Sequence, residues 1–134
     1  MTGRRILQPA GWPRPSGYSN GIAADGPTIV LAGQIGWDPT SGRLAEGLAA
    51  QVEQALRNIV ALLAEAGAEP PDVVRLTWFV TDMEQYRQNA KSIGEGYRRV
   101  MGRHFPTMSV IGVSCLVERE ALVEIEATAM ADNG

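Results

Sequence analysis

The chain is poor in the residues on which several protein classes depend: it has one cysteine, one histidine and one lysine among 134 residues. A lone Cys115 cannot form a disulfide within the chain, which is typical of a reducing compartment. A lone His104 gives no basis for a metal cluster, and no cofactor motif is present, so neither a metal nor a cofactor is predicted. We expect Cys115 to be a small core residue and His104 to cap carbonyl groups past a helix end.

Charge and hydropathy argue against two further classes. The 12 basic residues are outnumbered by 15 acidic ones and form no basic block, so no nucleic-acid partner is predicted. The longest apolar run, Ile59–Ala64, is too short to cross a bilayer, so no membrane partner is predicted. No apolar segment follows the first arginines, and no signal peptide is evident. We therefore expect a cytoplasmic protein with a single domain over residues 1–134.

Hydrophobic periodicity predicts an α+β fold with three strands, a helix, a strand, a helix and two strands. Apolar residues at three- and four-residue steps predict the helices, over Glu46–Ala66 and from Asp82 to Gly102. The predicted strands are Arg4–Gln8, Ile22–Ala24, Thr28–Ala32, Val73–Thr81, Thr107–Leu116 and Ala121–Met130. We expect hairpins through Asp25–Pro27 and through Glu118–Glu120.

Two helices can cover only one face of a six-stranded mixed sheet. The other face carries apolar as well as charged residues, because each face of the strand predicted over Thr107–Leu116 includes apolar side chains. Such a face is best buried against other subunits, so the pattern favours self-association.

The last predicted strand alternates strictly between apolar and polar residues. Val123, Ile125 and Ala127 share one face, whereas Glu124 and Glu126 share the other. Two close carboxylates that are also shielded from water raise each other's pKa, which would suit an acid–base site. The alternative is an ordinary solvated strand face.

Four segments in this order resemble the RidA/YjgF family of imine and enamine deaminases, whose members are also described as endoribonuclease L-PSP-like. The segments are Gly17–Gly21, Ala32–Ile35, Phe79–Asp82, and Phe105–Ser109 together with Leu122–Thr128. The resemblance covers nearly the whole chain. It implies a chorismate-mutase-like fold and a homotrimer with small-molecule ligands in clefts between the subunits.

The resemblance also implies roles for individual residues. Tyr18 matches a loop tyrosine that lines the cleft, and Gly33 matches a glycine whose backbone contacts the ligand. Asn89 corresponds to a helix asparagine of the site. Glu124 matches the carboxylate that places or activates the water, and Glu126 is its structural neighbour.

The chain also departs from the family's pattern. Met108 stands where the best-characterised deaminases have the arginine that holds the substrate carboxylate, which indicates a subgroup lacking that residue. Methionine cannot replace a charge-assisted, bidentate guanidinium contact. Val110 stands where many members have cysteine, and Ala32 where many have serine.

Three loop residues are further candidates. Arg14 lies in the same loop as Tyr18 and could replace the missing cation at the cleft. Trp12 and Trp37 could form flat apolar walls, although each could equally be an ordinary surface or packing residue.

The resemblance leads to one functional hypothesis and one main alternative. The hypothesis is hydrolytic deamination of an imine or enamine, with Glu124 positioning the water and with a substrate other than a small α-imino acid. The alternative is a non-catalytic trimer that binds or senses a small molecule. RNA cleavage is the weakest interpretation, because the chain is acidic.

Overall fold

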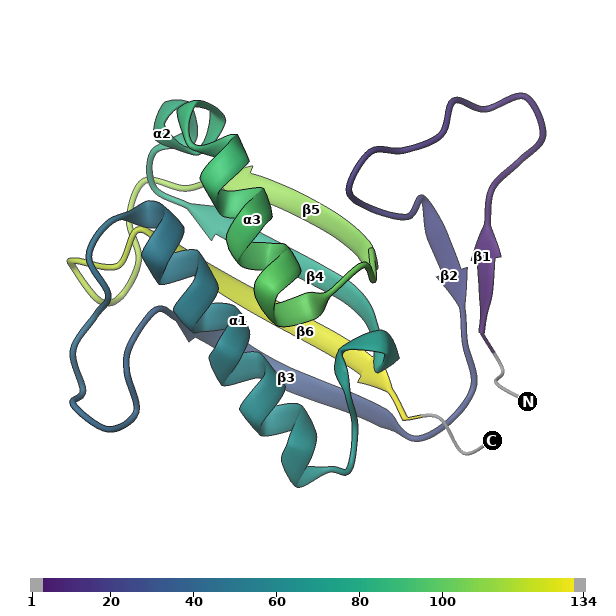
Figure 1. Cartoon of the computed structure of the whole chain (residues 1–134), viewed down its shortest axis with the longest axis horizontal. Coiled ribbons are helices and arrows are strands. Elements are labelled where there is room, and N and C mark those ends of the chain that lie inside the picture. Colours follow the sequence, from purple (N-terminus) through teal and green to yellow (C-terminus); the bar gives the residue numbers. More distant parts are fainter. Residues whose placement is uncertain (1–3, 132–134) are drawn as a thin grey trace.

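The computed structural model describes residues 4–131. The strands are β1 (Arg5–Leu7), β2 (Gly21–Ala23), β3 (Thr28–Ile35), β4 (Val73–Val80), β5 (Thr107–Gly112) and β6 (Val123–Met130). The helices are α1 (Leu48–Glu65), α2 (Met83–Gln88) and α3 (Ala90–Met101), with a short 3₁₀ turn over Pro70–Asp72 (Figure 1). None of the helices within residues 4–131 is long and apolar enough to cross a membrane.

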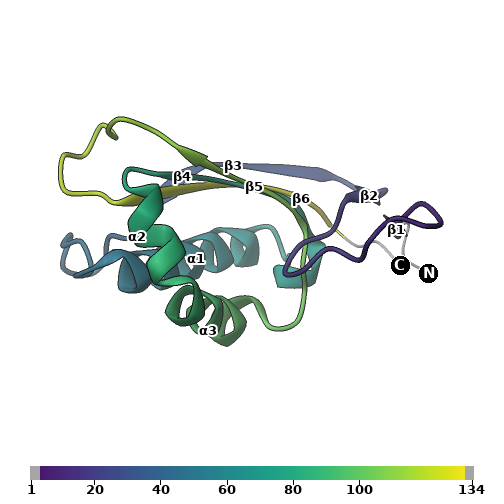
Figure 2. The same ribbon diagram turned by 90° about the horizontal axis from the view of Figure 1, so that it is seen from above.

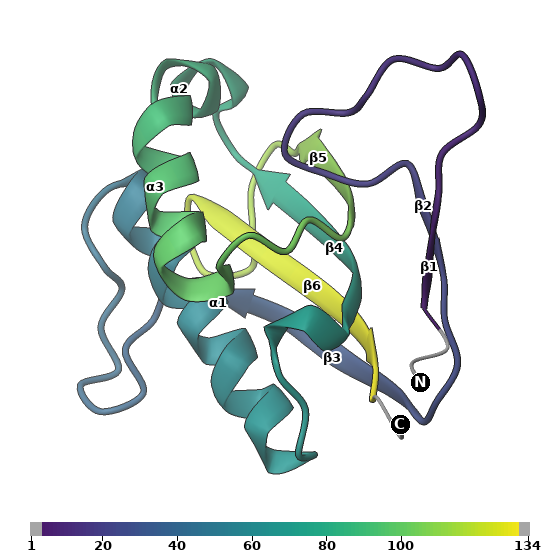
Figure 3. The same ribbon diagram turned by 45° about the vertical axis from the view of Figure 1, so that its right-hand side comes forward.

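The α+β class is confirmed, but a single six-stranded sheet is not formed. Four strands make the main sheet in the order β3-β6-β4-β5, and β1 and β2 form a separate two-stranded sheet. The two sheets meet at a parallel bridge between Ser19 and Thr107, where the Ser19 amide donates to the Pro106 carbonyl at 3.0 Å. The segment between β1 and β2 therefore lies beside the start of β5 (Figure 3).

Both predicted hairpins are wrong. The chain after β2 passes Gly26 and enters β3 at the far edge of the main sheet, so β2 pairs with β1 instead. β5 pairs in parallel with β4, because the intervening helices return the chain to the same end of the sheet. β6 then inserts antiparallel between β3 and β4.

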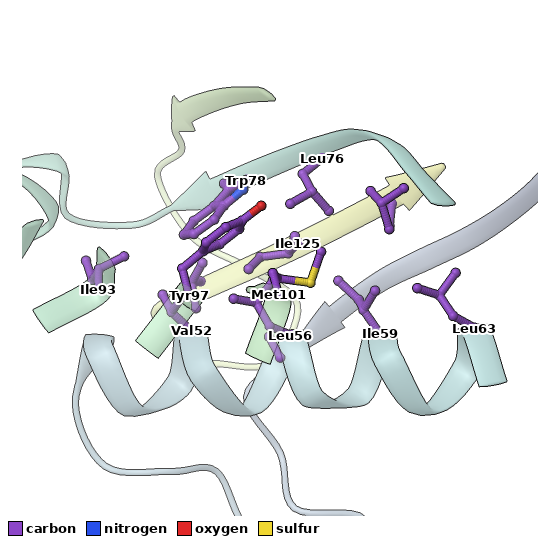
Figure 4. Packing of buried hydrophobic residues seen from close by; sticks show 14 of the residues in the cluster. Val52, Leu56, Ile59, Leu63, Leu76, Trp78, Ile93, Tyr97, Met101 and Ile125 are labelled. Carbon is purple, nitrogen blue, oxygen red and sulfur yellow. The ribbon is translucent and has the colours of Figure 1, made fainter. Parts of the chain in front are cut away.

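All three helices cover one face of the main sheet (Figure 2). The stripe of α1, which includes Val52, Leu56 and Ile59, is fully buried against the sheet, as its spacing predicts. Figure 4 shows this stripe facing Leu76 and Ile125. The apolar side chains of β6 thus point into the core, and its polar side chains point to the open face.

The second predicted helix is divided at Asn89. Asp82 begins α2 as predicted, because its carboxylate accepts a hydrogen bond from the Gln85 amide at 3.1 Å. The Asn89 side chain donates to the Gln85 carbonyl at 2.7 Å and ends α2, after which α3 starts at Ala90. The helices that face the sheet are further joined by Glu53 of α1, whose carboxylate binds Arg99 of α3 at 2.7 Å.

The opposite face of the main sheet carries exposed apolar side chains. Val30 of β3 is 76% exposed and Ile111 of β5 is 44% exposed. Glu124 on the same face is half-buried, and Glu126 is exposed. This surface matches the expected uncovered face, and the homotrimer that would bury it stays a prediction.

Candidate functional site

A cavity of about 370 Å³ lies between the helices, β5 and the loop before β2. Three of the predicted binding residues, Tyr18, Met108 and Val110, line it. They come from segments ninety residues apart in the sequence, so the fold brings them together.

The two sheet residues of the cavity are placed by the pairing of β5 with β4. Met108 lies opposite Leu76 and Val110 opposite Trp78, so both side chains follow the core-facing side of the sheet. The cavity opens here because β5 is the edge strand.

Tyr18 reaches the cavity because its neighbour is tied to the chain before β5. The Ser19 hydroxyl donates to the Phe105 carbonyl at 2.5 Å, in addition to the backbone bond between Ser19 and Pro106. Tyr18 itself stays 40% exposed and forms the outer rim.

Aromatic side chains form the inner walls. Trp78 and Tyr86 of α2 meet edge to face, with ring centroids 6.2 Å apart. Tyr97 of α3 also lines the cavity. Burial raises the pKa of Tyr86 and of Tyr97, so both phenols stay neutral. The Tyr97 hydroxyl is used structurally, since it donates to the His104 carbonyl at 2.6 Å.

No charged side chain of residues 4–131 lines this cavity. His104 lies outside it, where Nε2 forms a hydrogen bond with the Val73 carbonyl at 2.6 Å rather than with a helix-end carbonyl. The cavity of a single chain can therefore bind apolar groups, but it offers no counter-ion to an ionised ligand.

Glu124 lies on the other side of the same sheet. Its position on β6 is opposite Ile35 of β3 and Phe79 of β4, and it does not line the cavity. Gly33 lies directly beside it. A Cβ atom added at Gly33 would lie 2.6 Å from Cδ and 2.7 Å from Cγ of Glu124, and closer still to Oε2. Only glycine leaves room for this side chain in its present position.

A β-bulge accompanies this contact. Leu31 pairs with Ala127 and Gln34 pairs with Ile125, so β3 contains one more residue than β6 between these two pairs. Bulges of this kind redirect side chains and are frequent next to active sites. Gly33 and Glu124 were predicted as separate site residues, and the fold brings them together.

The remaining predicted residues do not meet in one chain. Asn89 binds the Gln85 carbonyl and does not line the cavity. Arg14 and Trp12 are exposed in the loop between β1 and β2. Trp37 lines a different cavity of about 610 Å³, together with Arg43, Glu118 and Glu120. The ligand contacts of Asn89, Arg14, Trp12 and Trp37 stay predictions.

We place the candidate site in the smaller cavity, because it holds three predicted binding residues and the larger one holds only Trp37. Its inner walls were not predicted as site residues. Tyr86, Ile93 and Tyr97 recur at a spacing that is typical of an ordinary helix core, and the edge position of β5 leaves part of this stripe open to a ligand.

Cys115 is exposed, so its prediction as a core residue is wrong. The reason is that β5 ends at Gly112, and the segment from 113 to 122 is a loop rather than a strand. Within residues 4–131, no group of three or more His, Cys, Asp or Glu side chains is placed to hold a metal ion.

These features define an α+β protein with a mixed sheet, helices on one face, an apolar cavity at the sheet edge and a glutamate packed against a glycine on the open face. The family model described as Endoribonuclease L-PSP matches residues 13–131. The chain belongs to this family, to which the RidA/YjgF proteins also belong.

Relatives and solved structures agree with this placement. The human 2-iminobutanoate/2-iminopropanoate deaminase is 33% identical over 129 residues, which cover 95% of this chain and 90% of the human one. The structure of the Rid family protein YyfB from Yersinia pestis has a TM-score of 0.82 and 36% identity, and the match covers 96% of this chain and 98% of that one. The structure of YjgF from E. coli has a TM-score of 0.68 and 30% identity, with 84% and 87% covered.

Proposed function

We propose that the protein hydrolyses an imine or enamine in a cleft that two subunits of a homotrimer complete. The observation that carries the proposal is the close packing of the Glu124 side chain against Gly33, in a chain whose relatives include named imine deaminases. The chemistry needs an electrophilic carbon, a water molecule and one proton-transfer group, with no metal or cofactor.

The proposed reaction balances with Glu124 alone as the acid–base group. Its carboxylate accepts a proton from water as the water oxygen bonds to the imine carbon. The proton then passes to the nitrogen, which gives a carbinolamine. Glu124 next takes the proton of the new hydroxyl group and delivers it to the nitrogen as the carbon–oxygen double bond forms and the carbon–nitrogen bond breaks, so ammonia and a carbonyl product leave and the carboxylate is restored. An enamine substrate is first protonated on carbon to give the imine.

Two subunits are needed because the parts of the site lie on opposite faces of one sheet. The cavity with Met108 is on the helix side, and Glu124 is on the open side. The open side also exposes Val30 and Ile111, apolar surface that a second copy would bury. A homotrimer with a chorismate-mutase-like core brings the open side of one subunit to the cavity of the next.

The cavity argues for a substrate other than a small α-imino acid. Met108 stands in place of the arginine that would bind a carboxylate, and among residues 4–131 no charged side chain lines the cavity. The same feature supports a second candidate function, a trimer that binds or senses a small apolar molecule without turnover. A cytoplasmic location and the absence of nucleic-acid partners remain part of the proposal.

Turnover assays with matched variants test the function. Imines are generated in situ from a panel of amino acids and amines, and carbonyl and ammonia formation is followed with the purified protein. Glu124→Gln should lower the rate roughly 10²–10⁴-fold, the usual contribution of a general acid or base. Glu126→Gln, a change of the same size on the same strand face, should have much less effect.

Equal losses from the two variants would contradict the assignment of Glu124. Binding of small apolar ketones without turnover of any imine in the panel would favour the non-catalytic alternative.

A further inference from the structure

We propose, on the basis of the proposed function, that the substrate carries an uncharged apolar group of ring size that occupies the cavity, and that Gly94 sets this specificity. The site residue predictions did not include Gly94, which lies within α3 and lines the cavity.

Glycine at position 94 lowers the stability of α3, so its presence there needs an explanation. A glycine in the interior of a helix is less favourable than alanine, because its backbone loses more freedom on folding. Its φ angle is not in the left-handed region, so its backbone conformation does not require glycine. An added Cβ would meet only the far end of Arg98, at an ordinary contact distance of 3.5 Å.

The other glycines of this segment have structural explanations. A Cβ at Gly96 would lie 3.2 Å from the Glu53 carboxylate, where α3 packs on α1. Gly102 ends α3 with a φ of 69°, which favours glycine. Gly94 has neither explanation, and what it does is leave the cavity open beside α3.

The cavity suits a planar apolar group. Its volume of about 370 Å³ lies at the lower end of small-molecule sites, and Trp78 and Tyr97 present aromatic surface to it. Met108 adds a flexible, polarisable wall that adapts to a ring. An ionised group would be desolvated here without a counter-charge, so the group that enters is uncharged.

Two imines that differ only in the proposed group provide the kinetic test. These are 2-imino-3-phenylpropanoate and 2-iminopropanoate, made in situ from phenylalanine and alanine. Wild type should prefer the phenyl compound in kcat/KM. Gly94→Leu, which fills the cavity, should lower kcat/KM for the phenyl compound about 10–100-fold, the range expected for a few lost apolar contacts. Turnover of 2-iminopropanoate, which has no ring to enter the cavity, should fall by a clearly smaller factor than turnover of the phenyl compound.

Ser92→Leu is the matched control, because Ser92 is exposed on the same helix and does not line the cavity. It should leave both substrates unchanged. If Gly94→Leu does not fold, Gly94→Ala replaces it, since one methyl group favours the helix and still narrows the cavity. Gly94→Ala should reduce the phenyl preference by a smaller factor.

A binding measurement separates this inference from the proposed function. Calorimetric titration with phenylacetone, a neutral ketone, should show binding to wild type and to Ser92→Leu and weaker binding to Gly94→Leu. This pattern without turnover of any imine supports the cavity and contradicts the deaminase function. The opposite pattern overturns the inference and leaves the deaminase function standing. In that pattern 2-iminopropanoate is turned over with no preference for the phenyl compound. Phenylacetone then binds equally to all variants, or it does not bind to wild type.

Discussion

Gly33→Ala tests the close packing of Glu124 against Gly33. Alanine can adopt the backbone at this position, because the φ angle of Gly33 is not left-handed. Its methyl carbon, however, would lie 2.6 Å from Cδ and 2.7 Å from Cγ of Glu124, far inside van der Waals contact. The change therefore acts on the Glu124 side chain, which must leave its position or push the two strands apart.

The expected size follows from overpacking. Glu124 is half-buried on the open face, so its side chain can turn away from the new methyl group, and a side chain forced off its preferred rotamer costs about 0.5–1.5 kcal/mol. In a Glu124→Ala background the space is empty, and replacing glycine by alanine in a strand should be neutral or stabilising by up to roughly 1 kcal/mol. The two mutations should therefore show a coupling free energy of about 0.5–1.5 kcal/mol.

Urea unfolding of wild type, both single variants and the double variant measures this coupling. Protein concentration must be the same throughout, because the stability of an oligomer depends on it. Where imine turnover is present, Gly33→Ala should also lower kcat by about 10²-fold, since a displacement of roughly 1 Å of a reacting group has that effect. An equal effect of Gly33→Ala on stability in both backgrounds would refute the reasoning.

Three further predictions follow from other parts of the molecule. Light scattering should give about three times the monomer mass of 14.4 kDa, and a stable monomer at micromolar concentration would contradict the two-subunit site. Wild type should turn over 2-iminopropanoate weakly, and Met108→Arg should bind small carboxylates better. Robust wild-type turnover that persists in Arg14→Ala would show that neither an arginine at position 108 nor Arg14 is needed. Arg99 and then Arg57 hold the pKa of Glu53 below its ordinary value of 4.5, so this small stabilisation is present above pH 4.5 and lost as the pH falls through the lowered pKa. The thermal midpoints of wild type and Glu53→Gln should differ at pH 7 and converge in acid, and a difference that persists there would contradict this origin.

Local patterns in the sequence determined the elements. The three- and four-residue spacing of apolar side chains places α1 within two residues of its observed bounds, Leu48–Glu65. Strict alternation over 123–129 correctly separates the buried residues of β6 from Glu124 on the open face. Both signals depend only on residues close together in the chain, and the side chains of one helix or strand therefore reveal them.

Only the tertiary structure decided which strands pair and which site residues meet. The family resemblance assigns Tyr18, Met108 and Glu124 to one ligand site. Within a single chain, however, the fold places Met108 and Glu124 on opposite faces of the sheet. The break at Asn89 and the open aromatic wall containing Trp78 were not predicted either. Strand order and cavity shape depend on contacts between segments far apart in the chain, and periodicity within a single segment carries no information about its partner.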